Sequence, residues 1–143
     1  MLKASEEKSR KTHETIARAF EKRVADPASY KIVYGYFVKS GIFSKKVSNY
    51  VVGYSETLKE IVIVPITFDA AEVAEAIRLK KEDIISAKFG LQGDLRIKSN
   101  VLPKDLRFIV PPFTTSVLEA TFVMPIVQQE ETLAFRDFIK NNF

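Results

Sequence analysis

Cysteine is absent from this chain, and histidine occurs only once, at position 13. The lack of cysteine excludes disulfides and thiolate metal ligands. A metal centre or a histidine-based catalytic site would need partners close to His13, and the chain has no second histidine or cysteine to offer. We find no serine nucleophile elbow either, and therefore expect no enzymatic activity, no metal and no cofactor.

Long apolar runs are also missing. No uninterrupted stretch of about 18 apolar residues occurs, so a membrane-spanning helix is not expected. Residues 1–26 alternate charges and lack the apolar core of a signal peptide. These two absences favour a cytoplasmic protein.

The remaining composition is that of one ordinary globular domain. The chain has 143 residues, of which 46% are hydrophobic and 28% charged. The net charge of +4 comes from 22 basic and 18 acidic residues that are spread along the chain. A nucleic-acid-binding protein usually concentrates its positive charge on one face, so no nucleic-acid partner is expected.

An amphipathic helix is predicted over residues 5–24. Ser5 can cap its start, since a serine side chain accepts a hydrogen bond from the first turn. Ile16, Phe20 and Val24 are spaced four residues apart and form one narrow apolar stripe. This stripe needs a cover, which either the rest of the chain or a neighbouring subunit could provide.

The rest of the chain, after an N-terminal helical unit of residues 1–27, is predicted to be a β-rich domain of residues 28–143. It ends with a second amphipathic helix over residues 128–141, and residues 69–76 could form either helical turns or a connection into a strand. We prefer the connection, because Ile77 and Leu79 alternate with charged residues. The expected strands cover residues 30–39, 47–54, 60–68, 76–80, 84–89, 95–98, 106–110 and 117–124.

The first of these strands is apolar on both faces. Tyrosines and aliphatic residues occupy the even positions of residues 30–38, and Val33, Gly35 and Phe37 occupy the other face. This pattern is typical of a strand that is covered on both sides or wrapped into a small barrel.

Two segments resemble the bacterial pleckstrin-homology-like and GRAM-like domains. The sequence LKKEDIISAKFG, residues 79–90, is similar to the passage between the two sheets of that fold, and residues 46–65 are similar to its second and third strands. The resemblance covers residues 30–141. It implies an α+β fold: a barrel of two antiparallel sheets with a C-terminal capping helix, here with an extra N-terminal helix. Phe135 or Phe138 would replace the tryptophan that often anchors the last helix, since this chain has none.

The resemblance also implies a non-catalytic binding module. Our first hypothesis is protein–protein or self-assembly contacts, with Ile16, Phe20 and Val24 as the contact residues. Some relatives bind anionic lipid head groups next to the first hairpin, where this chain has three lysines, and lysine binds phosphate as a point charge. The alternatives are therefore an acidic membrane surface bound by these lysines, lysines that only keep the hairpin soluble, and a barrel that binds a small ligand. The three lysines are Lys39, Lys45 and Lys46.

Overall fold

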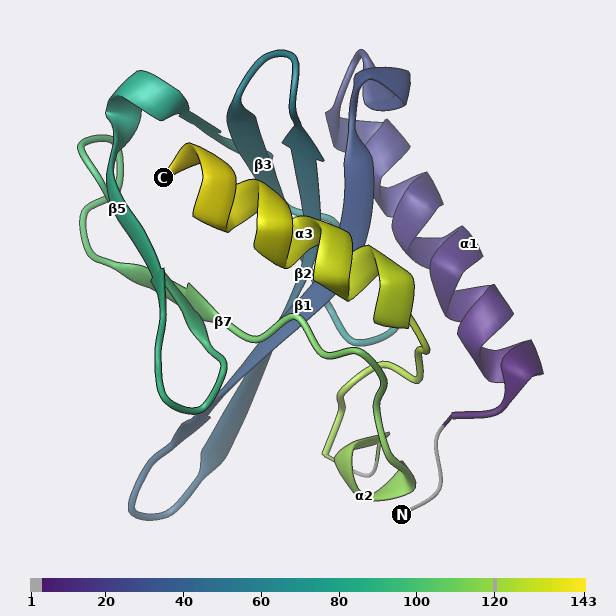
Figure 1. The fold of residues 1–143 in the computed structure, drawn as a ribbon. Helices are drawn as coiled ribbons and strands as arrows, with labels where there is room; N and C mark the ends of the chain where they lie inside the picture. The colour runs from purple at the N-terminus through teal and green to yellow at the C-terminus, as the bar shows by residue number, and fades with distance from the viewer. Residues whose placement is uncertain (1–3, 120) are drawn as a thin grey trace.

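Two antiparallel sheets and two long helices make up the computed structural model, which describes residues 4–119 and 121–143 (Figure 1). The α+β class, the two sheets and the C-terminal helix are as predicted. The first sheet has the order β1-β2-β3-β4 and the second β5-β6-β7. The strands are β1 (Lys31–Ser40), β2 (Lys45–Ser55), β3 (Glu60–Ile66), β4 (Ile77–Lys80), β5 (Ile84–Phe89), β6 (Leu95–Ser99) and β7 (Leu106–Phe108). The α-helices are α1 (Glu6–Arg23), α2 (Ser116–Glu119) and α3 (Gln129–Asn142), with single 3-10 turns at Pro27–Ser29 and Lys81–Asp83.

Helix α1 forms as the sequence predicts. The Ser5 hydroxyl oxygen accepts a hydrogen bond from the backbone N–H of Lys8 at 3.2 Å and thereby caps the first turn. The predicted stripe of Ile16, Phe20 and Val24 is buried, with at most 2% of each residue exposed. All three belong to a core that α1 shares with one face of the four-stranded sheet.

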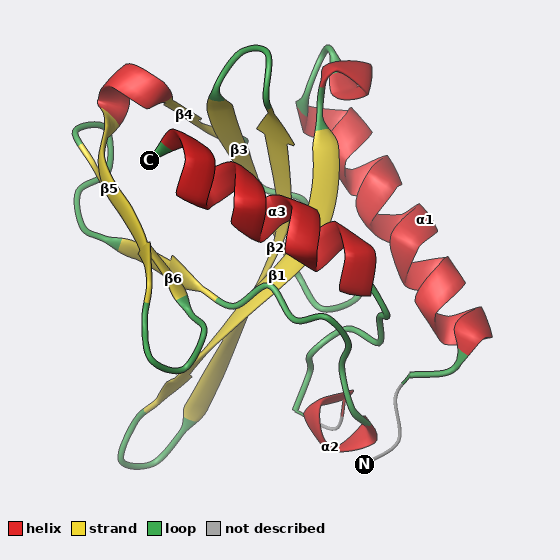
Figure 2. Cartoon of the chain, viewed as in Figure 1, coloured by secondary structure: helices red, strands yellow, loops and turns green. Residues whose placement is uncertain are grey.

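Helix α3 covers the opposite face of the same sheet and crosses in front of it in Figure 2. Phe135, Phe138 and Ile139 pack there together with the inner face of the second sheet. Both faces of β1 are therefore covered, as its two apolar faces predict: Tyr34 belongs to the core under α1, and Val33 to the core under α3.

Glycine at position 53 allows α1 to approach the sheet closely. A Cβ atom at Gly53 would lie 2.6 Å from Cε1 of Phe20, which is too close for two carbon atoms. The ring of Phe20 thus occupies the space that the side chain of any other residue at position 53 would fill.

A buried glutamine joins the start of α3 to β1. The Gln128 side-chain oxygen accepts a hydrogen bond from the backbone N–H of Tyr34 at 2.9 Å. Its side-chain nitrogen donates to the carbonyl oxygens of Tyr34 at 2.9 Å and of Pro111 at 2.8 Å. Since Gln128 is only 1% exposed, these bonds satisfy polar groups that water cannot reach.

The backbones of the two sheets are joined at one described pair of residues. Tyr36 of β1 and Ile109, which follows β7, exchange backbone hydrogen bonds of 2.9 and 2.7 Å. Among the described residues the sheets do not close into a barrel, so the predicted barrel is not confirmed. The fold is two open sheets, joined at this point and packed on α3.

The predicted strand over residues 117–124 is wrong, and its residue 120 lies outside the described part. The short helix α2 occupies Ser116–Glu119, and Phe122 adopts a left-handed conformation with φ 67°. Local bonds satisfy the backbone: the N–H of Thr121 donates to Leu118 at 2.9 Å. Val123 and Met124 are both buried, although neither belongs to a strand.

The ambiguous residues 69–76 form no helix. Apart from an isolated bridge between Ile66 and Val73 they are irregular, and β4 begins at Ile77. The preferred prediction, a connection into a strand, is confirmed. None of the described helices is both long enough and apolar enough to cross a membrane.

Candidate functional site

The β1–β2 hairpin extends away from the rest of the fold, toward the lower left of Figure 1. Its strands pair in register from Lys31 opposite Tyr54 to Ser40 opposite Lys45. The end of the hairpin is exposed from Lys39 through Lys46. The covered faces of β1 and β2 thus continue into an exposed arm, residues 39–46.

Two large apolar side chains stand at the end of this arm. Ile42 is 92% exposed and Phe43 is 98% exposed. The backbone N–H of Gly41 donates to the carbonyl oxygen of Ser44 at 2.6 Å, which closes the turn around them. Exposed aromatic and aliphatic residues at one projecting point are typical of a surface that binds something apolar.

All three predicted lysines surround this point. Lys39 lies directly opposite Lys46, and Lys45 lies opposite Ser40. Like charges at opposed positions of two strands are destabilising. In the part of the chain that the structure describes, none of the three forms an ion pair. The hairpin tip, Ile42 and Phe43, is therefore an apolar surface surrounded by three lysines.

The three lysines were predicted from the sequence, but Ile42 and Phe43 were not. A signal was present, because two large apolar residues stand between the turn residues Gly41 and Ser44. Apolar residues in a turn lie outside both strands, so their side chains do not reach the core that the strands cover.

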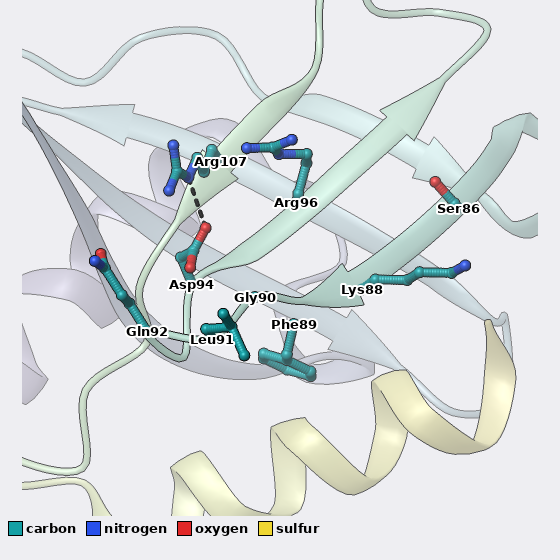
Figure 3. Close-up of a pocket in the computed structure, with 9 residues that line it drawn as sticks. All are labelled: Ser86, Lys88, Phe89, Gly90, Leu91, Gln92, Asp94, Arg96 and Arg107. Carbon is teal, nitrogen blue, oxygen red and sulfur yellow. Dashed lines mark hydrogen bonds and ion pairs between the residues drawn. The ribbon is translucent and has the colours of Figure 1, made fainter.

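A groove of about 500 Å³ lies on the second sheet, on the face away from α3 (Figure 3). Its walls come from β5, β6, β7 and the turn between β5 and β6. The lining residues are Ser86, Lys88, Phe89, Gly90, Leu91, Gln92, Asp94, Arg96 and Arg107.

Three cations form a row across this groove. Lys88 of β5 pairs in register with Arg96 of β6, and Arg96 pairs with Arg107 of β7. Directly opposed residues of neighbouring strands point to the same face, as Figure 3 shows for these three side chains. Within residues 4–119 and 121–143, neither Lys88 nor Arg96 forms an ion pair.

Asp94 is the one acidic residue among those that line the groove; it forms an ion pair with Arg107 and also interacts with the charge of Arg96. The Arg107 Nε donates to its carboxylate at 2.6 Å, and the Asp94 side chain is 7% exposed. This hydrogen bond holds the pKa of Asp94 below its ordinary value, against the opposing effect of burial. The guanidinium of Arg107 also lies over the ring of Phe37 in β1, 5.2 Å from its centre, so the groove adjoins the hairpin strands.

This row of cations was not predicted from the sequence. The three residues are separated by eight and eleven positions, and only the pairing of three strands brings them together. The glycine-bounded turn at residues 90–94 would have sufficed for the first pair, because a hairpin centred on Gln92 places Lys88 opposite Arg96.

A second hollow, of about 760 Å³, lies beside the base of the hairpin. Lys45 and Lys46 line it together with apolar residues that include Phe68 and Phe122. Those two rings meet edge to face, with their centres 5.4 Å apart. The hollow extends the combination of lysine and apolar surface from the tip toward the body of the protein.

Two other polar side chains, those of His13 and Asp69, have structural partners. His13 Nε2 lies 2.9 Å from the carbonyl oxygen of Val127, and Asp69 accepts a hydrogen bond from the N–H of Ala71 at 3.0 Å. No three histidine or acidic residues in the described part of the chain are placed to hold a metal ion. The predicted partner-contact residues Ile16, Phe20 and Val24 are packed on the chain's own sheet.

Comparison with protein-family models, with curated proteins and with solved structures finds no match to this chain. The resemblance of residues 46–65 and 79–90 to pleckstrin-homology-like domains therefore stays a prediction from the sequence.

Proposed function

We propose that this protein is a non-catalytic, pleckstrin-homology-like module that attaches to acidic membrane surfaces through the β1–β2 hairpin. The observation that carries the proposal is the exposed pair Ile42 and Phe43, surrounded by three lysines that form no ion pair with the residues that the structure describes. An acidic bilayer offers both complementary features, a negatively charged surface and an apolar interior directly beneath it.

The two features act in different ways. Each lysine near an acidic membrane surface contributes about 1 kcal/mol, and this attraction weakens as salt is added. The apolar tip adds a contribution that salt does not screen, because Ile42 and Phe43 leave water when they enter the interface. Stable attachment generally needs two such signals together.

Self-assembly through α1 has less support. Ile16, Phe20 and Val24 would have to leave the core of their own chain to reach a neighbour. The hairpin tip, by contrast, can bind without any rearrangement of the fold. A protein that binds the tip is the competing explanation, and the experiment below separates it from a membrane.

Sedimentation with vesicles tests the proposal. Vesicles of pure phosphatidylcholine would be compared with vesicles that contain phosphatidylserine, using the wild-type chain and a variant with Lys39→Gln, Lys45→Gln and Lys46→Gln. The matched control changes three exposed lysines elsewhere, Lys22, Lys80 and Lys104, to glutamine.

Because each lysine contributes about 1 kcal/mol, the hairpin variant should bind acidic vesicles about a hundredfold more weakly than the wild-type chain. The control has the same net charge and should lose much less. Equal binding to neutral and acidic vesicles, or equal losses in the two variants, would exclude this function and favour a protein partner.

A further inference from the structure

We infer that the groove on the outer face of β5, β6 and β7 is a separate binding site for a phosphate-bearing anion. The inference rests on the row of Lys88, Arg96 and Arg107, which the strand register places side by side in one hollow. It does not depend on the hairpin, whose lysines and apolar tip belong to other strands.

The charges of the groove are unbalanced in the direction that an anion would correct. Three cations share one carboxylate, that of Asp94, and this carboxylate is bound to Arg107. Cations at opposed positions of neighbouring strands repel one another. A sheet that served only as a scaffold would gain stability from neutral residues at these positions, whereas a bound anion removes the repulsion.

The donors fit a phosphate group. Asp94 occupies the Nε of Arg107, which leaves the two terminal nitrogens of that guanidinium for a ligand. Arg96 offers a complete fork, and planar forks bind phosphate oxygens through two parallel hydrogen bonds. Lys88 adds a mobile point charge, and the Ser86 hydroxyl lies at the far end of the groove (Figure 3).

Two backbone amides of the turn are already hydrogen-bonded within it. The N–H of Gly90 donates to the carbonyl oxygen of Asp94 at 2.7 Å, and the N–H of Gly93 donates to Gly90 at 3.1 Å. These amides are used inside the turn and cannot cradle a phosphate as a glycine-rich loop does. The cationic side chains are therefore the main donors of the site, so its strength depends on their charges.

The size of the hollow indicates more than a single ion. A volume of about 500 Å³ is within the range of small-molecule sites. Leu91 is fully exposed on the turn beside the cations, and this turn and the β1–β2 hairpin extend toward the same end of the molecule in Figure 1. A phosphomonoester can reach such a site as a soluble molecule or as the head group of a lipid.

Calorimetric titration of the full chain with inorganic pyrophosphate and with glycerol 3-phosphate tests the site. The test variant is Arg96→Gln, and the matched control is Lys98→Gln. Lys98 lies two residues further along the same strand, is exposed on the same face, and does not line the groove. Thermal unfolding of both variants checks that each remains folded.

Saturable binding of pyrophosphate with a dissociation constant below about 1 mM is expected for the wild-type chain. Arg96→Gln should weaken it at least about tenfold, or 1.4 kcal/mol, and Lys98→Gln less than about threefold. The variant Ile42→Ser/Phe43→Ser should bind the soluble probes as the wild-type chain does. Absence of binding at millimolar concentration, or equal losses in the Arg96 and Lys98 variants, would overturn the inference.

Vesicles then distinguish the two sources of the phosphate group. Phosphatidic acid carries a phosphomonoester head group, and phosphatidylserine vesicles can be matched to it in surface charge. Preference for phosphatidic acid that Arg96→Gln abolishes identifies a lipid head group. Pyrophosphate binding without that preference identifies a soluble ligand. If the hairpin variants lose vesicle binding but keep the soluble probe, the two sites are independent.

Discussion

Replacing Ile42 and Phe43 with serine separates the role of the hairpin tip from the stability of the fold. Both side chains are more than 90% exposed, so their removal deletes no core contact and should change the free energy of unfolding by no more than about 0.5 kcal/mol. Complete burial of an isoleucine or phenylalanine side chain contributes about 1.5–3 kcal/mol. If the interface buries about half of each, the pair contributes about 2 kcal/mol, and the double variant should bind vesicles about thirtyfold more weakly.

The assay is vesicle sedimentation at two salt concentrations. The loss caused by Ile42→Ser/Phe43→Ser should be the same at low and at high salt, because burial of apolar surface is not screened. The loss caused by the lysine changes should shrink as salt is added. An unchanged vesicle affinity of the tip variant, in a chain that unfolds at the wild-type denaturant concentration, would refute insertion of the tip.

Three further predictions concern stability and are measured by urea unfolding. Gly53→Ala should destabilise the chain by about 1–3 kcal/mol, since the new Cβ overlaps the Phe20 ring. Gln128→Ala should cost about 2–3 kcal/mol, because it leaves the buried N–H and carbonyl of Tyr34 without these partners. The pKa of Asp94 is lowered in the folded chain, so its contribution is complete above the unfolded-state pKa near 4 and is lost as pH falls below it. Asp94→Asn should therefore reduce stability at pH 7 by about 1–2 kcal/mol and flatten its acid dependence.

Each of these predictions has a control. Gly41→Ala is the match for Gly53→Ala, since the new Cβ meets only Ser44 of an exposed turn, at 3.3 Å from its carbonyl oxygen and 3.6 Å from its hydroxyl oxygen. Equal effects at the two glycines would contradict the packing of α1 on β2. Gln129→Ala, on the exposed first turn of α3, should leave stability within about 0.5 kcal/mol. An Asp94→Asn chain that loses stability between pH 5 and pH 3 as steeply as the wild type would show that other carboxylates control that range.

Much of the fold could be read from local patterns. The cap at Ser5 and the stripe of α1 depend only on neighbours within the helix, and the bounds of β5 follow from its alternation and from the turn after it. The covered faces of β1 could be predicted for the same reason, because apolar residues on both sides of a strand require two covering layers.

The failures arose where the deciding partner is distant in the sequence. Residues 117–124 alternate like a strand, yet among the described residues no strand pairs with Val123 or Met124. The N–H of Val123 donates to the carbonyl oxygen of Leu118, whereas the N–H of Met124 donates to the hydroxyl of the distant Tyr34. The closure of the sheets into a barrel could not be decided either, since it depends on one contact between Tyr36 and Ile109.

The two candidate surfaces also differ in how far the sequence could predict them. The lysines of the first hairpin are close in the sequence, and the turn alone brings them together. The cation row needs two strand registers at once, and sequence patterns specify registers poorly when the strands are as short as the three residues of β7.

The exchange of hydrogen bonds between Tyr36 and Ile109 has a mechanical consequence. Tyr36 lies on β1 before the exposed arm, and Ile109 follows the strand that bears Arg107. A force on the end of the arm is therefore transmitted along β1 into the other sheet instead of being absorbed by a slack linker. The bridge between Tyr36 and Ile109 therefore helps to set the distance between the β1–β2 hairpin and the turn that carries Leu91. Replacing Ile109 with proline removes the hydrogen bond from its N–H to Tyr36. This change would let the two sheets move relative to each other, and it would leave the side chains of the hairpin and of the β5–β6 turn unchanged.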